Sequence, residues 1–336
     1  MALNPLRRRG GLRWFITKII ILVVLFVLPF TGLVNEYWLS VLTRVNIFLV
    51  LAITFDFFSG TTLYLNLGHS FIVGLAAYSL AIFNIFAHIP VALAIPLATI
   101  TATIISLLLF LPSIRVKGEY FAILSLLYPI ILISIATTQP FSAYLGGEAG
   151  LMSDQLLLGY ALKLSPEHSL FFLTTSYYLL SLAMAVAAFI ILYKLAYSDF
   201  GFTLRAIGED EELAEATGVN TTRVKLKGFL IASALASLAG SFYAAIKPPI
   251  TTDFVSPDSI LIPILTAVIV GGLGSIVGTA ISSYILFIIY EALWGVFGVW
   301  RTVVYMLILI VFVVLKPEGI MYQLYVKARK VLGGGG

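Results

Sequence analysis

The segment KLAYSDFGFTLRAIGEDEELAEATGVNTTRVKLKG, residues 194–228, is the one long internal stretch of this sequence that could not lie in lipid. Strongly apolar stretches flank it on both sides. Because charged side chains are costly in the bilayer core, the segment is predicted to form a loop on one face of a membrane. The loop carries eleven charged residues: Lys194, Asp199, Arg205, Glu209, Asp210, Glu211, Glu212, Glu215, Arg223, Lys225 and Lys227.

A short helix is predicted in the middle of this loop, over 209–217. The acidic run from Glu209 to Glu212 opens it, where the helix dipole favours negative charge. Gly218 follows its last position, Thr217, where a left-handed cap suits glycine. A short, capped, charged helix on the water side of a membrane protein is typical of an element that docks a soluble partner. The alternative is an ordinary solvated loop.

The composition outside the loop indicates the class of protein. The 336 residues are 60% hydrophobic and 11% charged, with a mean hydropathy of +1.06. A soluble domain of this length could not keep a wettable surface with so few polar residues. The alternating ten-residue segments of a membrane β-barrel are absent. The prediction is an all-α polytopic membrane protein that forms a single transmembrane domain over residues 1–336.

Ten apolar segments approach the roughly 20 residues that a spanning helix needs. Several are short, and the eighth and ninth are separated only by GGLGS at 271–275, which fits either two spans or one broken pair. Ten spans would place both termini on the same side. The segments are 17–34, 39–58, 70–87, 89–111, 119–138, 169–193, 226–246, 259–273, 276–295 and 301–316.

The distribution of basic residues predicts the orientation, because cytoplasmic loops are enriched in Lys and Arg. With both termini and 194–228 in the cytoplasm, 16 of the 20 basic residues lie on that side. The four other basic residues lie outside that side or in spans near the outer face. The outer loop 139–168 lies on the opposite side of the membrane and is predicted to form a short lid or rim. The tail 317–336 is predicted to be flexible. The 16 residues are Arg7, Arg8, Arg9, Arg13, Lys18, Arg115, Lys117, Lys194, Arg205, Arg223, Lys225, Lys227, Lys316, Lys327, Arg329 and Lys330.

Irregular backbone is predicted at membrane depth in 56–69, 247–263 and 271–278, where Gly, Pro and polar residues interrupt the apolar runs. Such backbone is tolerated only inside protein or beside a wet cavity, and broken helices are a recurring device of transporters. The alternative is loop ends and close helix contacts through small residues. Candidate residues of a translocation pathway are Asn66, Gly68, His69, Ser70, Tyr78, Gly271, Gly272, Gly274 and Glu291.

Charged residues within the spans are few. Asp56 and Arg44 lie near span ends, where each is expected to cap a helix or extend to the membrane surface. Glu291 lies deeper and is expected either to line a pathway or to pair with Arg301. His69 is equally suited to a hydrogen bond between helices. A proton relay would need more such groups.

Catalytic and cofactor motifs are missing from the sequence. No GxxxxGK[ST] phosphate loop, nucleophile elbow, carboxylate pair or clustered metal-ligand pattern occurs, and the absence of cysteine excludes disulfides and thiolate sites. The pI near 9.1 comes from basic loops, so in a membrane protein it indicates topology in the first place and nucleic-acid binding only after that. We therefore expect no enzymatic activity, no ATP hydrolysis by this chain, and no metal, cofactor or nucleic-acid partner.

Four stretches together resemble a known family in order and spacing. They are NLGHSFIVGLAAYSLAIF (66–83), LPSIRVKGEYFAILSL (111–126), GFTLRAIGEDEELAEATGVNTTRVKLKGFLIASALASLAGSFYA (201–244) and AVIVGGLGSIVGTAISSYIL (267–286). On these stretches the chain is similar to the permease subunits of bacterial and archaeal ABC importers for branched-chain amino acids, the LivM type, over roughly 40–316. It departs from that pattern in the outer loop, where YLGGEAGLMS at 144–153 replaces a TGG element.

The resemblance implies an inner-membrane permease for branched-chain amino acids. It would pair with a homologous second permease, two ABC ATPase subunits and an extracytoplasmic solute-binding protein, in contact with membrane lipid. The 209–217 helix would be the coupling helix, with Ala216 allowing close approach and Gly218 the sharp turn. Arg205 and Glu215 would be charge partners for the ATPase or for each other. The implied coupling residues are Arg205, Ala206, Gly208, Glu209, Glu215, Ala216 and Gly218.

Two alternatives to this function stay open. Relatives that carry urea, sugars or nucleosides share the same cytoplasmic loop, so the cargo is less specific than the class. A stand-alone ion-coupled secondary transporter would need no ATPase. It would instead need coupling-ion sites inside the membrane, for which the sequence offers few acidic residues.

Overall fold

The computed structural model describes residues 25–31, 34–113, 116, 118–300, 303–307 and 310–311. Most of the predicted spans 17–34 and 301–316, the tail 317–336 and both chain termini lie outside the described residues. The same holds for most of the basic residues that predict the orientation. Of those 16, only Lys194, Arg205, Arg223, Lys225 and Lys227 are described.

Every regular element of the described chain is a helix, which confirms the all-α polytopic class. The main helices of the predicted apolar spans are α2 (Glu36–Phe55), α3 (His69–Ile85), α4 (Val91–Ser113), α5 (Glu119–Thr137), α8 (Pro166–Ala196), α11 (Thr221–Ile246), α12 (Ile262–Gly271) and α13 (Ile276–Phe297). The remaining elements are η1 (Leu28–Thr31), η2 (Asp56–Gly60), α6 (Ser142–Leu145), α7 (Leu158–Ala161), α9 (Asp199–Glu209), α10 (Glu211–Ala216), η3 (Thr252–Phe254), η4 (Pro257–Leu261) and η5 (Gly298–Trp300).

Six described helices are long and apolar enough to cross a membrane: Glu36–Gly60, Val91–Ser113, Glu119–Thr137, His168–Ala196, Thr221–Ile246 and Ile276–Leu293. Two shorter apolar helices, His69–Ile85 and Pro257–Gly271, occupy the places of two more predicted spans. Both are shortened by irregular backbone that adjoins them. Eight of the ten predicted spans thus coincide with a helix, and the total of ten stays a prediction.

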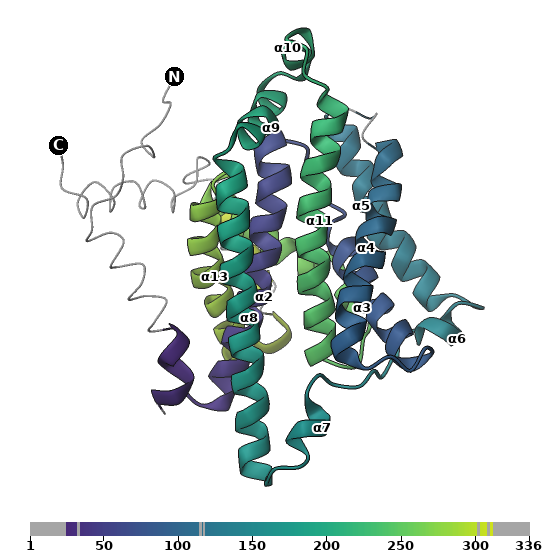
Figure 1. The fold of residues 1–336 in the computed structure, drawn as a ribbon, viewed down its shortest axis with the longest axis vertical. Helices are drawn as coiled ribbons and strands as arrows, with labels where there is room; N and C mark the ends of the chain where they lie inside the picture. The colour runs from purple at the N-terminus through teal and green to yellow at the C-terminus, as the bar shows by residue number, and fades with distance from the viewer. Residues whose placement is uncertain are drawn as a thin grey trace, which may run out of the picture.

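Helices α2 and α11 form the centre of the bundle. The buried share of the apolar stretch is 78% in Glu36–Gly60 and 67% in Thr221–Ile246, against 28–33% in α4, α5 and the α8 span. In Figure 1, α2 lies between α8 and α11, and it packs against both and against α12 and α13. Small buried residues such as Ala236 and Gly240 let α11 approach its neighbours closely. A Cβ on Gly240 would lie 3.0 Å from the backbone of Val73 in α3.

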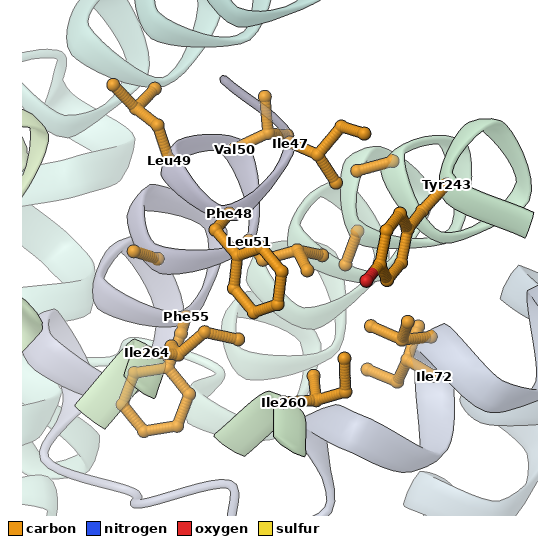
Figure 2. Packing of buried hydrophobic residues seen from close by; sticks show 14 of the residues in the cluster. Ile47, Phe48, Leu49, Val50, Leu51, Phe55, Ile72, Tyr243, Ile260 and Ile264 are labelled. Atoms are coloured by element: carbon orange, nitrogen blue, oxygen red, sulfur yellow. The ribbon is translucent and has the colours of Figure 1, made fainter. Parts of the chain in front are cut away.

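The apolar core joins α2 to its neighbours α3, α11 and α12. Figure 2 shows Phe48 and Phe55 of α2 beside Ile72 of α3, Tyr243 of α11 and Ile264 of α12. The Phe48 ring lies 5.9 Å from that of Tyr243, an edge-to-face contact. Since lipid is as apolar as these side chains, close packing rather than the hydrophobic effect holds such a core together in a membrane.

The backbone is irregular at all three predicted places. After α2, a π-turn (η2) leads into non-helical backbone at 63–68. Another π-turn, η4, precedes α12. Between α12 and α13, Gly272 and Gly274 have φ values of +96° and +76°, which glycine adopts without strain.

The outer loop 139–168 is fastened across the ends of α3 and α11. Leu151 and Ile250 exchange two backbone hydrogen bonds of 2.9 Å, and Leu156 N donates to Ala245 O at 2.9 Å. Asn84 of α3 accepts from the Asp154 backbone N–H at 2.8 Å. The predicted role of this loop as a lid or rim stays a prediction.

Candidate functional site

The loop 194–228 contains two helices where one was predicted. The prediction that Glu209 opens the short helix is wrong, because Glu209 ends α9 and α10 begins at Glu211. Asp210 interrupts the helical conformation between them with extended backbone at φ −157°, and its Oδ1 accepts from Leu213 N at 2.9 Å. An aspartate at an N-cap satisfies a backbone donor that the first turn leaves free, which favours the break.

The end of α10 is as predicted. Gly218 has φ +88°, its N–H donates to Glu215 O at 2.9 Å, and the next N–H, of Val219, donates to Ala214 O at 3.2 Å. This pair of bonds is the Schellman cap, which closes a helix with a left-handed glycine. The helix therefore has a defined end despite its six residues.

Helix α10 lies at one tip of the molecule, beyond the ends of α2, α8 and α11 (Figure 1). Leu213 is 62% exposed, while Ala214 is buried. The two predicted charge partners do not pair with each other among the described residues. Arg205 lies over the rings of Tyr197 and Phe202, and Glu215 accepts from Thr221 Oγ1 at 2.7 Å.

Helix α9 lies directly on the backbone that follows η2. A Cβ on Gly208 would be 2.6 Å from the carbonyl oxygen of Thr61 and 2.9 Å from the carbonyl carbon of Thr62. Any side chain at Gly208 would therefore push α9 away from this segment. Ala206, by contrast, is exposed.

The first residue of α10, Glu211, is held by an ion pair with a buried lysine. Lys225 Nζ of α11 donates to Glu211 Oε1 at 2.5 Å and to Tyr64 Oη at 3.3 Å, and the Tyr64 hydroxyl donates to the other Glu211 oxygen. Lys225 is 2% exposed. Burial alone would raise the pKa of Glu211, but hydrogen bonds from Lys225 and Tyr64 and the Lys225 charge outweigh it, and the pKa is lowered. The cluster ties α10 to the stretch after η2.

That same stretch meets the break between α12 and α13. Asp56 is fully buried, and its carboxylate accepts from Gly274 N at 2.7 Å and from Thr279 Oγ1 at 3.1 Å. A Cβ on Gly60 would lie 2.5 Å from Gly274 N, so the two backbones touch. Asp56 is the C-cap residue of α2, as one of the two expectations had it. The other expectation, extension of its side chain to the surface, is wrong, because its two oxygens accept from Gly274 N and Thr279 Oγ1.

These contacts converge on one segment, 56–64, which we call the junction. On one side it contacts α9 through Thr61 and α10 through Tyr64. On the other it contacts the glycine break through Asp56 and Gly60. Direct contacts therefore join α9 and α10 to an irregular part of the membrane domain.

The predicted pathway residues separate into four places. Gly271, Gly272 and Gly274 lie at the α12–α13 break beside the junction. Asn66 and Gly68 line a small cavity of about 10 Å³ together with Ser106 and Tyr128. His69, Ser70 and Tyr78 lie buried on α3; His69 Nε2 is 3.3 Å from Thr54 Oγ1, and the hydroxyls of Ser70 and Tyr78 have no hydrogen-bond partner among the described residues.

Glu291, in the fourth place, lies on α13. Arg44 Nε and Nη2 donate to its two carboxylate oxygens at 3.1 and 3.0 Å. The expected extension of Arg44 to the surface is therefore replaced by this pairing; Arg301, the other expected partner of Glu291, lies outside the described residues. Both side chains line a pocket of about 380 Å³ formed by α2, α11, η3, η4 and α13. We call it the outer pocket.

Sequence reasoning missed Tyr64 and Lys225 as site residues, and treated Arg44 as a surface group. Lys225 stands among the other basic residues of the 194–228 loop, so the sequence gives no sign that it is buried. Arg44 and Glu291 each carried a signal, a charge inside an apolar span, but they are 247 positions apart in sequence, and nothing in the sequence indicates that they pair.

Comparison with known proteins gives a family match over most of the chain. The family described as "Branched-chain amino acid transport system / permease component" matches residues 37–315. The LivM permease protein of the high-affinity branched-chain amino acid transport system of Salmonella typhimurium is 24% identical, over 90% of this chain and 73% of its own length. LivM of Escherichia coli K12 is also 24% identical, over 91% and 74%.

A second type of permease protein from the same transport systems is also similar. LivH of Escherichia coli K12 is 30% identical over 51% of this chain and 54% of its own length. No solved structure matches this chain.

Proposed function

The chain belongs to the family of branched-chain amino acid transport permease components, and from this premise we propose that it is the translocating subunit of an ABC importer for branched-chain amino acids. A separate ATPase would supply the energy. The observation that carries the proposal is the chain of contacts from the exposed helix α10, through Glu211 and Tyr64, to the junction and the glycine break at Gly274.

Helix α10 would be the coupling helix that docks on the ATPase. It is exposed, capped at both ends and acidic in its first turn. Arg205, Ala206, Gly208 and Glu209 of α9 and Glu215, Ala216 and Gly218 in and after α10 would position or contact it. Gly208 would act from below, through its contact with Thr61, rather than by touching the ATPase.

The proposed assembly contains two permeases, two ATPases and an extracytoplasmic binding protein in the inner membrane, with the termini and 194–228 in the cytoplasm. Similarity to both LivM and LivH proteins supports a homologous second permease. Apolar side chains exposed along α4 and α5 would face lipid or that subunit; they include Leu93, Leu97, Ile100, Ile104, Ile123, Leu127 and Ile130.

Uptake in proteoliposomes tests this function. The chain would be reconstituted with its candidate partners, and labelled leucine uptake would be followed with ATP on either side. Uptake that needs ATP on the loop side and the binding protein on the other supports the proposal. Uptake by the chain alone on an ion gradient would overturn it in favour of a secondary transporter. Nucleotide-driven turnover without leucine transport would redirect the cargo to urea, sugars or nucleosides.

Replacing Gly218 tests the docking role of α10. Gly218→Val is expected to lower the ratio of leucine transported to ATP hydrolysed several-fold, because valine is strained at φ +88° and the cap would open. A Cβ there would meet nothing within 4 Å, so crowding is not the cause. Gly218→Asn is the matched control, since asparagine tolerates left-handed backbone. Equal coupling in glycine and valine forms would contradict the docking role.

A further inference from the structure

We propose that the outer pocket is a binding site within the permease for a zwitterionic amino acid with an apolar side chain, held by Lys247 and Asp253. This inference rests on the proposed function and gives it a place in the membrane domain. The site differs from the glycine break and from the α3 residues that the sequence indicates.

The position of the outer pocket suits capture from the side away from the ATPase. Helix α11 begins at Thr221, close to α10, and ends at Ile246, next to Lys247. Helix α2 likewise runs from Glu36 to the junction at Asp56. Arg44 is twelve residues from Asp56, or about 18 Å along the helix at 1.5 Å per residue. The pocket therefore lies toward the opposite end of the bundle from α10.

The size of the pocket fits a small ligand. Its volume of about 380 Å³ falls at the lower end of the roughly 300–1,000 Å³ of small-molecule sites. Its apolar wall comes from the packed core: Phe48 of α2, Tyr243 of α11, Ile260 of η4 and Phe287 of α13. The Phe48 and Phe287 rings are 4.8 Å apart, so this wall is continuous. A branched aliphatic side chain would find aromatic and aliphatic contacts there.

Four charged groups line the outer pocket, and they differ in whether they already have a charged partner. Arg44 and Glu291 satisfy each other through two hydrogen bonds. Lys247 Nζ donates only to the neutral Tyr243 hydroxyl, at 3.1 Å, and lies over the Tyr243 and Phe254 rings. Asp253 has no hydrogen bond or ion pair with any other described residue.

One cation and one anion are thus available beside an apolar wall. A free amino acid carries a carboxylate and an ammonium group on one carbon, and charge-assisted hydrogen bonds to Lys247 and Asp253 would complement both. The Arg44–Glu291 pair would fix the floor between α2 and α13 without competing for the ligand. A sugar or urea carries no ionised groups to pair with Lys247 and Asp253, so the chemistry favours a zwitterion.

Ligand analogues test which group each side chain holds. Equilibrium binding of labelled leucine would be measured on the full permease complex in nanodiscs, without the binding protein. Leucine amide, which lacks the carboxylate charge, and 4-methylpentanoate, which lacks the ammonium, would be the competitors. Lys247→Met is expected to weaken leucine binding about tenfold but to leave the binding of leucine amide unchanged. Asp253→Asn is likewise expected to weaken leucine binding but to leave the binding of 4-methylpentanoate unchanged.

The matched control is Lys163→Met, which removes an outer-loop lysine that lies over Tyr160 and does not line the pocket. A purely structural role would weaken all ligands equally, so the analogue pattern distinguishes the two. The proposal is overturned if both variants bind leucine as the unmodified complex does, or if each variant binds leucine and both analogues with equally reduced affinity. Absence of leucine binding in a complex that still transports leucine overturns it as well. Failure of the proposed function would instead appear as absence of ATP-driven uptake by the unmodified complex.

Discussion

Replacing Asp56 with alanine is expected to abolish ATP-driven leucine uptake and to destabilise the purified chain by about 3 kcal/mol or more. Asp56 is fully buried and accepts hydrogen bonds from Gly274 N and Thr279 Oγ1. Alanine would leave both donors unsatisfied, and each buried unsatisfied donor costs about 1–3 kcal/mol. Because these bonds join α2 to the α12–α13 break, their loss would also free the glycine segment from the junction.

Asp56→Asn separates the hydrogen bonds from the charge. The amide oxygen of asparagine can accept from Gly274 N, and its NH₂ group can donate to the Thr279 hydroxyl, so both contacts can persist without a carboxylate. We expect this variant to keep most of its thermal stability in detergent and a measurable share of uptake. Thr279→Val, which removes only one bond, should fall between Asp56→Asn and Asp56→Ala.

The measurements are melting temperature in detergent and initial uptake rate in proteoliposomes, compared at equal amounts of inserted protein. An Asp56→Ala chain that melts and transports as the unmodified chain does would show that the junction contacts carry neither stability nor coupling. Normal melting with lost uptake would assign Asp56 to transport alone.

The sequence predicts the helices and their breaks far better than it predicts the contacts between them. Composition and span length indicate the all-α class, and glycine and proline mark the irregular backbone at 56–69, 247–263 and 271–278. These features depend on local residue types. The left-handed cap at Gly218 is of the same kind, since it follows from one residue and its place in a helix.

The charged residues are different, because their role depends on what the fold brings beside them. Asp56 and Thr279 are 223 residues apart, and Tyr64 and Lys225 are 161 apart. Arguments from the helix dipole or from the number of basic residues in a loop consider each charge only with its neighbours in sequence. The same limit explains the wrong start of α10: the acidic run fits a helix N-terminus anywhere along it, and only the Asp210 side-chain bond to Leu213 selects the position.

The contacts through the junction divide into rigid and adjustable ones. Gly60 against Gly274 and Gly208 against Thr61 are backbone contacts with no room for a side chain, so they transmit displacement directly. The Tyr64–Glu211–Lys225 cluster is held by charge and hydrogen bonds, which depend on protonation and can reform. Coupling that runs through both kinds of contact would be steric at its centre and electrostatic where α10 joins it.

Glu211→Ala is accordingly expected to have the second large effect. It would leave the Lys225 ammonium, which is 2% exposed, with the Tyr64 hydroxyl as its hydrogen-bond partner. Removing one member of a fully buried ion pair costs about 3–5 kcal/mol, which is an upper bound here because Glu211 is partly exposed, and the melting temperature should fall. The matched control is Glu209→Ala, an exposed glutamate at the end of α9, which should change stability by no more than about 0.5 kcal/mol.

The double variant Glu211→Ala with Lys225→Met distinguishes stability from coupling. It removes the unpaired charge, so much of the lost stability should return. The link from α10 to Tyr64 would remain broken, so uptake should stay low while the chain melts near its original temperature. Recovery of uptake together with stability would show that the cluster holds the fold and transmits nothing.

The pH dependence of the melting temperature gives an independent test of the Glu211–Lys225 ion pair. The pKa of Glu211 is lowered from its ordinary value of 4.5, because hydrogen bonds from Lys225 and Tyr64 and the Lys225 charge outweigh the effect of burial. A lowered pKa in the folded state contributes stability above the ordinary value, and this contribution is lost as the pH falls through the folded-state pKa. The melting temperature of the unmodified chain should therefore decrease below about pH 4.5 more steeply than that of Glu211→Gln, in which the side chain cannot ionise. Parallel decreases in the two chains would mean that Glu211 gains no net stabilisation from Lys225, and the cluster would then be too weak to hold α10 against the junction.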